Sequence, residues 1–112
     1  MIELVTPNDE WARQMLERHL VAANVRYGAS DAEAVDLVCA EWWACREVWL
    51  ADKAKGVMLR CAMANPKVVM PHIMGDGRHI RGVVKDALRF GWDNGIVTVI
   101  VWVQDPALGR IM

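Results

Sequence analysis

The segment from Gly75 to Gly82 combines glycines and arginines in the manner of an anion-binding loop. Glycines let the main chain approach phosphate oxygens, and a following helix N-terminus contributes about half a positive charge. We therefore expect the segment to hold an anionic group through Gly75, Gly77, Arg78, Arg81 and Gly82. Asp76 opposes this use unless Arg78 or Arg81 pairs with it. An ordinary strand-to-helix turn with solvent-facing arginines is the alternative interpretation.

His72, three residues before this segment, is the best candidate for proton transfer. An imidazole with an unperturbed pKa near 6.5 accepts protons at neutral pH. We expect Pro71 to break the strand ladder and open a cleft beside His72. A half-buried histidine without a chemical role is the alternative. Of the other histidines, His19 is interpreted as an edge or core residue, and His79 as exposed or in contact with phosphate.

The elements that position these residues follow from apolar periodicity and turn signals. We predict the order β-α-α-β-β-β-α-β-α. The first helix begins at Pro7, after a hydroxyl cap, and the second follows a capping box at Ser30. The predicted strands span 2–5, 47–51, 56–63, 67–74 and 96–103. The first two predicted helices span 7–23 and 31–44. A third helix begins within 75–82 and ends near 93, and a fourth begins at 105.

The strand predicted over 96–103 is almost entirely apolar. A strand without polar alternation is typical of burial on both faces. We therefore expect it in the interior of the sheet, parallel to the strand over 67–74. It is far too short to span a bilayer, so we expect no membrane segment.

Composition predicts one globular domain over residues 1–112, with 54% hydrophobic and 24% charged residues. The net charge of −1 gives no reason to expect nucleic acid as a partner. Cys39, Cys45 and Cys61 have neither CxxC spacing nor matching histidines, so we expect free thiols and no metal site. No basic and apolar leader begins the chain, and the expected location is the cytoplasm.

The element order and the loop of His72-Ile73-Met74-Gly75-Asp76-Gly77 resemble the GNAT fold of acyl-CoA-dependent N-acyltransferases. The resemblance implies an α/β (α+β) fold with a mixed, mainly antiparallel sheet flanked by helices. It also implies acetyl-CoA or another acyl-CoA as cofactor, with its pyrophosphate on the glycine loop and its thioester on main-chain N–H groups near Val69 and Met70. His72 would then be the base that deprotonates the acceptor amine.

The chain departs from this family pattern after the strand over 96–103. It places Gln104-Asp105-Pro106 where Asn is common, has no Tyr in the following helix, and lacks the last two strands, which suggests a C-terminally truncated domain. The apolar edge left behind favours self-association or a protein partner. A catalytically silent scaffold that binds protein is therefore the alternative, including an accessory or virion-associated protein like the short GNAT-like proteins of bacteriophages, located in the host cytoplasm or the virion. An unrelated small α/β binding module is the third interpretation.

Overall fold

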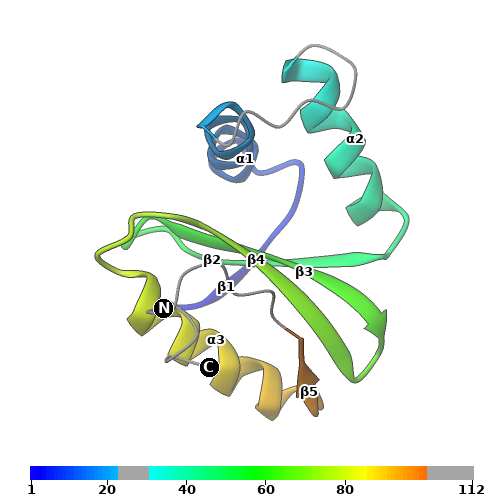
Figure 1. The fold of residues 1–112 in the computed structure, drawn as a ribbon, viewed down its shortest axis with the longest axis vertical. Coiled ribbons are helices and arrows are strands. Elements are labelled where there is room, and N and C mark those ends of the chain that lie inside the picture. Colours follow the sequence, from blue (N-terminus) through cyan, green and yellow to red (C-terminus); the bar gives the residue numbers. More distant parts are fainter. Residues whose placement is uncertain (23–30, 101–112) are drawn as a thin grey trace.

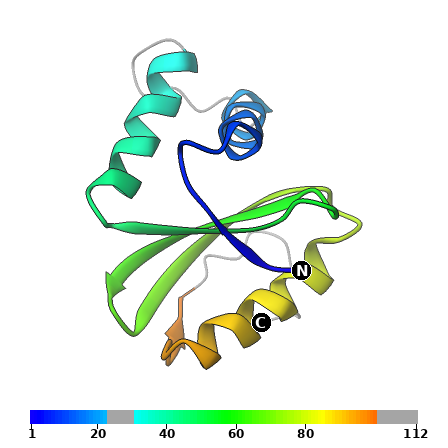
Figure 2. The same ribbon diagram turned by 180° about the vertical axis from the view of Figure 1, so that it is seen from behind.

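The strands of the structure form one mixed sheet with helices on both faces. The computed structural model describes residues 1–22 and 31–100. The elements are β1 (Glu3–Val5), α1 (Glu10–Ala22), α2 (Asp31–Trp43), β2 (Glu47–Asp52), β3 (Val57–Asn65), β4 (Val68–Gly75), α3 (Ile80–Asp93) and β5 (Thr98–Val99). The strands lie in the order β1-β2-β3-β4-β5, antiparallel as far as β4, with β5 parallel to β4. Helices α1 and α2 cover one face, and α3 covers the other (Figures 1 and 2). The predicted fold class is confirmed.

Two apolar cores hold these layers together. Between the sheet and the helix pair, Trp49 and Met58 pack with Leu16 of α1 and residues of α2. On the opposite face, Leu59 and Val83 belong to the core under α3. Successive residues of a strand point to opposite faces. Alternate side chains of β3 therefore pack into the two different cores. This alternation determines whether a side chain faces α1 and α2 or faces α3.

Helix α1 begins three residues later than predicted. The Thr6 carbonyl accepts a hydrogen bond from the Asp9 amide at 2.9 Å, so residues 6–9 form a turn instead of the first helical turn. Asp9 is then the N-cap, because its Oδ1 accepts from the Ala12 amide at 3.4 Å. The sequence correctly predicts that a helix starts in this region. Because residues 6–9 form a turn instead, the helix begins three residues further along the chain.

The strand β5 confirms one prediction and corrects another. It pairs with β4 in parallel, through Val68 with Thr98 and Val69 with Val99. In the part of the chain that the structure describes, however, β5 is the outermost strand, and Val97 is 64% exposed. The prediction of an interior strand buried on both faces is therefore wrong for residues 96–100. Residues 101–103, the helix start at 105 and the cap at Ser30 lie outside the described residues.

Candidate functional site

The turn between β4 and α3 is closed by Asp76. The Asp76 carboxylate accepts three side-chain hydrogen bonds from Arg78: Nη2 to Oδ2 at 2.7 Å, Nε to Oδ1 at 3.1 Å and Nε to Oδ2 at 3.2 Å. It also accepts the Arg78 backbone N–H at 3.0 Å. These hydrogen bonds lower the pKa of Asp76 to about 2. Arg78 thus neutralises the carboxylate, and it is less free to bind a ligand than the sequence suggested.

The start of α3 presents main-chain donors that nothing in the described chain uses. The backbone N–H groups of Gly77, Ile80, Arg81 and Gly82 donate to no described residue. Apart from the chain neighbours and the backbone of the helix itself, no described atom lies within 4 Å of where a Cβ would stand at Gly77 or Gly82. Arg81 is exposed and forms no ion pair with any residue in 1–22 or 31–100. The donor set therefore fits a phosphate group at the positive end of the helix.

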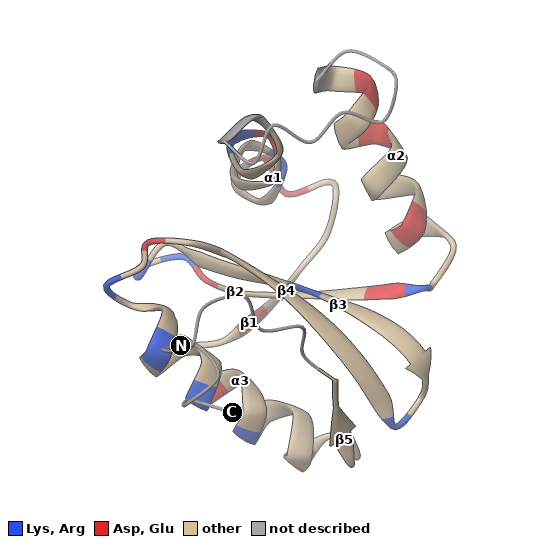
Figure 3. Ribbon diagram, in the orientation of Figure 1, with Lys and Arg blue, Asp and Glu red and all other residues tan. Residues whose placement is uncertain are grey.

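Basic residues continue from this turn along α3. Arg81, Lys85 and Arg89 are all exposed, and their spacing of four places them on one side of the helix. Figure 3 shows this basic series on α3, and on the other side of the sheet it shows α2, whose charged residues are acidic. Lys85 and Arg89 lie outside the glycine segment, so the local pattern of that segment does not indicate them.

Gly75 holds the turn against the neighbouring strand. Its φ is +126°, and an added Cβ would stand 2.0 Å from the Gly56 carbonyl oxygen. That same oxygen accepts the Asp76 amide at 3.0 Å. Gly75 is therefore a structural requirement of the turn, whereas Gly77 leaves room for an approaching group.

His72 lies opposite Arg60 in the pairing of β4 with β3. Beneath them, Arg60 donates to both carboxylate oxygens of Glu47 at 3.1 Å, and the Trp49 indole donates to Glu47 Oε1 at 2.9 Å. All three side chains of this network are buried. Partial desolvation, followed by the charge of Arg60, lowers the pKa of His72, so the imidazole is neutral at pH 7. A neutral imidazole can accept a proton.

His19 of α1 belongs to the same region. Burial, then the charges of Arg60 and His72, lower its pKa as well. His19 also lines a hollow with Trp11 and Arg18 that reaches Asp76 of the turn. The interpretation of His19 as an edge or core residue missed this position, and no local sequence signal indicates it. Arg60 and Glu47 were missed for the same reason, because their pairing depends on the register of two strands.

The edge of β4 that faces β5 is open beyond Val69. Lys67 and Val69 turn their carbonyls to β5, where they accept from residues 97, 98 and 100. Along a strand these directions alternate, so Pro71 and Ile73 face the same side, and Met70 and His72 direct their main-chain groups to β3. On the side facing β5, no described strand pairs with β4 beyond Val69. The Ile73 N–H is then the donor available at this edge. The predicted thioester contacts at Val69 and Met70 are not available there, because Val69 is paired with β5 and the Met70 N–H faces β3.

Pro71 does not break the ladder to β3, contrary to the prediction. It pairs with Cys61 in an uninterrupted register. This is possible because its missing N–H falls on the side facing β5. The opening therefore lies between β4 and β5, and His72 is reached from the α1 side. His72 precedes Gly75 by three residues, or about 10 Å along a strand.

The cysteines are free thiols, with Cys39 and Cys61 buried and Cys45 exposed. Burial raises the pKa of Cys61 to about 12 and also raises the pKa of Cys39, which keeps both thiols protonated. Within residues 1–22 and 31–100, no three His, Cys, Asp or Glu side chains gather closely enough to hold a metal ion. No helix in these residues is long and apolar enough to span a membrane.

Comparison with known proteins identifies the fold. No protein-family model matches the chain, and no curated protein matches its sequence. A solved structure from Agrobacterium tumefaciens that carries an acetyltransferase assignment superposes with a TM-score of 0.64 at 16% identity, covering 99% of this chain and 88% of that one. The aminoglycoside 6'-N-acetyltransferase of Enterococcus faecium gives 0.60 at 15% identity, with 90% of this chain aligned to 60% of its length. An aminoglycoside 6'-N-acetyltransferase in complex with coenzyme A gives 0.62 at 14% identity, with the same coverage. The chain therefore has a GNAT-like fold, and the residues that the structure describes include no strand after β5.

Proposed function

We propose that the protein is an N-acyltransferase that takes an acyl group from acyl-CoA and transfers it to an amine. The observation that carries this proposal is the set of unused N–H donors at Gly77, Ile80, Arg81 and Gly82, directly after a strand with an open edge. The GNAT fold supports it, and one neighbour of that fold is a complex with coenzyme A.

The turn and α3 would hold the phosphates of the donor. The free N–H groups bind the pyrophosphate, and the Arg81 guanidinium adds a full positive charge beside them. Arg78 contributes less because it pairs with Asp76. Lys85 and Arg89 extend the positive potential along the helix, which favours encounter with a multiply charged donor.

The open edge of β4 would hold the thioester. A carbonyl that accepts from the Ile73 N–H is polarised as negative charge develops on its oxygen. The bound acyl-CoA supplies the activated acyl group. His72 takes the proton that the amine releases as the new C–N bond forms and the C–S bond breaks, and the departing thiolate is protonated by water. The acceptor amine enters from the hollow beside α1 that Trp11 and His19 line.

Chemical-shift mapping with coenzyme A tests the location of this site. We expect the amide resonances of Gly77, Ile80, Arg81 and Gly82 to shift on titration, because the phosphates accept from these groups. Amides of α2 serve as the internal control. Saturable shifts confined to another surface, or no shifts at millimolar coenzyme A, would contradict the proposal.

A second function, protein binding without catalysis, is favoured by the exposed apolar side chains at the β5 edge. Val97 is 64% exposed, Ile100 43% and Trp92 48%. Such side chains are typical of an association surface. An accessory or virion-associated role is one form of this function, and it rests on the sequence resemblance alone. Sedimentation velocity distinguishes the cases: a concentration-dependent dimer that Val97→Lys abolishes supports association, and a monomer at all concentrations opposes it.

A further inference from the structure

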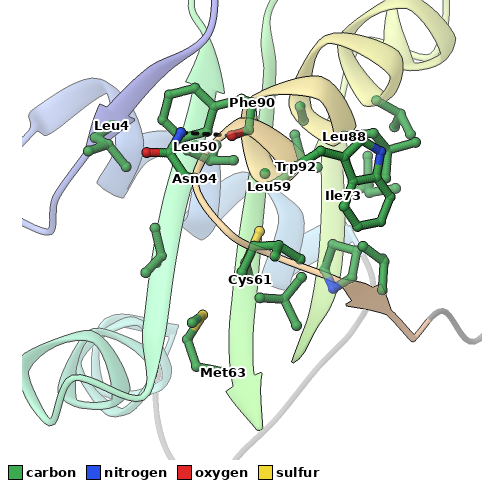
Figure 4. Close-up of a pocket in the computed structure, with 18 of the residues that line it drawn as sticks. Leu4, Leu50, Leu59, Cys61, Met63, Ile73, Leu88, Phe90, Trp92 and Asn94 are labelled. Carbon is green, nitrogen blue, oxygen red and sulfur yellow. Dashed lines mark hydrogen bonds between the residues drawn. The ribbon is translucent and has the colours of Figure 1, made fainter. Parts of the chain in front are cut away.

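A separate cavity of about 270 Å³ lies on the α3 face of the sheet. Figure 4 shows Cys61 and Met63 of β3 pointing into it, with Leu4 of β1 at one side and Leu88 and Trp92 of α3 at the other. The cavity is on the opposite face of the sheet from His72, so the acceptor hollow beside α1 does not include it.

The lining selects an apolar occupant. None of its described side chains is charged, and the amide of Asn94 is already used in a 2.7 Å hydrogen bond to the Phe90 carbonyl. The Cys61 thiol is protonated, because burial raises its pKa to about 12. Of the described lining side chains, only the Asn94 amide and the Trp92 indole could form hydrogen bonds with a polar ligand here, so most of its hydration would be lost without replacement, which is unfavourable. Hydrocarbon suits the site.

The cavity adjoins the open edge of β4. Its lining includes Val69 and Val99, the last pair that joins β4 to β5, and then Pro71 and Ile73, where no described strand continues the pairing. A thioester held at the Ile73 N–H would therefore stand at the boundary of the cavity. An acyl chain that continues from it has an apolar space to enter.

The volume indicates the length of that chain. A dry apolar cavity of about 150 Å³ accepts a benzene-sized molecule of six carbons. On the same scale, the cavity under α3 holds about eleven aromatic carbons. A methylene is larger than an aromatic CH, so a straight chain of roughly eight to ten carbons fits. An acetyl group would leave most of it empty.

We propose that this cavity binds the acyl chain of the donor, so that the preferred substrate is a medium-chain acyl-CoA of roughly eight to ten carbons and not acetyl-CoA. This inference rests on the proposed acyl-CoA function and adds the class of acyl group. Each methylene that enters the cavity tightens binding by about twofold to fourfold, the upper figure corresponding to about 0.8 kcal/mol.

Calorimetric titration with acetyl-, octanoyl- and palmitoyl-CoA tests the proposal. Octanoyl-CoA should bind at least 30-fold more tightly than acetyl-CoA, as roughly six methylenes are added at twofold or more each. Palmitoyl-CoA should gain nothing further, because its chain exceeds the volume. Cys61→Phe fills the cavity and should abolish the preference for octanoyl-CoA while acetyl-CoA binding persists. Ala64→Phe, at an exposed position of the same strand, is the matched control and should retain the preference.

The outcomes separate this inference from the function on which it rests. Equal affinities for acetyl- and octanoyl-CoA overturn the chain-length assignment and leave the acyltransferase intact. A preference for octanoyl-CoA that survives in folded Cys61→Phe places the chain elsewhere and also overturns it. If Cys61→Phe fails to fold, Met63→Trp at the partly exposed rim replaces it, with the same expected loss. Absence of binding by all three thioesters overturns both proposals.

Discussion

Arg60 and Glu47 form a two-pronged ion pair across β3 and β2, with both contacts at 3.1 Å and both side chains buried. The Trp49 indole satisfies Glu47 further, at 2.9 Å. The pair lies next to His72, because His72 is opposite Arg60 in the pairing of β4 with β3. A charge that loses its partner in such a place is far more costly than one at the surface.

Removal of Glu47 should therefore destabilise the fold strongly. We expect Glu47→Ala to lower the free energy of unfolding by about 3 to 5 kcal/mol, because Arg60 is left buried and unpaired. The control is Asp36→Ala, which breaks the exposed contact with Arg13 at 3.0 Å and should cost about 0 to 1 kcal/mol. Urea denaturation measures both, and equal losses in the two variants would contradict the assignment.

Gly75 and Gly77 should respond differently to the same change. Gly75→Ala places a Cβ 2.0 Å from the Gly56 oxygen at a φ of +126°, and we expect a loss of stability of about 2 kcal/mol or more. Gly77→Ala meets open space and has no positive φ, so stability should change by less than about 0.5 kcal/mol. Thermal unfolding of the two variants decides this. A large loss at Gly77 would mean that the turn has another conformation.

Stability should fall on mild acidification because of His19 and His72. Both pKa values lie below 6.5 in the folded protein, so from about pH 6.5 downwards the unfolded chain binds protons that the folded one does not. Stability is complete above that pH. Below it, stability declines by at most about 1.4 kcal/mol per pH unit for each histidine, and by less for His72, because its imidazole is exposed and solvent screens its charge. Carboxylates with a lowered pKa, such as Asp76, reduce stability only below about pH 4, where the unfolded chain begins to protonate them.

Urea denaturation at pH 7.5, 6.5 and 5.5 checks this dependence. The double variant His19→Asn and His72→Asn should lose most of the decline, whereas His79→Asn, in the exposed turn, should keep it. The same decline in all three proteins would exclude the two histidines as its source.

The roles of the two arginines of the turn should also differ. Arg81→Ala should weaken coenzyme A binding by about 1 to 3 kcal/mol, and Arg78→Ala by less, because Arg78 already pairs with Asp76. Asp76→Asn removes the opposing charge, retains an acceptor for the Arg78 amide, and should strengthen binding. Arg89→Ala, two turns along α3, is the control for general charge loss. Calorimetry of the four variants would contradict the account if Arg81→Ala binds as well as the wild type.

Local signals in the sequence predicted most of the fold. Turn residues and apolar runs placed β2, β3 and β4 to within two residues at each end, and periodicity placed α3. The start of α1 was missed because Thr6 and Asp9 form a turn that propensity does not distinguish from a helical one. The exposure of β5 was not predicted. An apolar run indicates that a strand could be buried, but it does not show whether another element covers that strand.

The candidate site was predictable only where its residues are adjacent in sequence. Gly75, Gly77 and Arg81 share one short segment, and His72 lies just before it. The pairing of Glu47 with Arg60, the position of His19 and the cavity under α3 all depend on register and packing between distant segments. A pattern in one stretch of sequence holds no information of this kind.

Calorimetric titration of the wild-type protein with coenzyme A is the most direct test of the central claim, because every role proposed for the turn requires that it bind the phosphates of this molecule. We expect saturable binding at a stoichiometry of one, weakened by added salt, because salt screens charged contacts. It also predicts that 3'-dephospho-coenzyme A binds measurably, because the pyrophosphate is retained. No heat of binding at millimolar coenzyme A, in protein shown to be folded, would contradict the account.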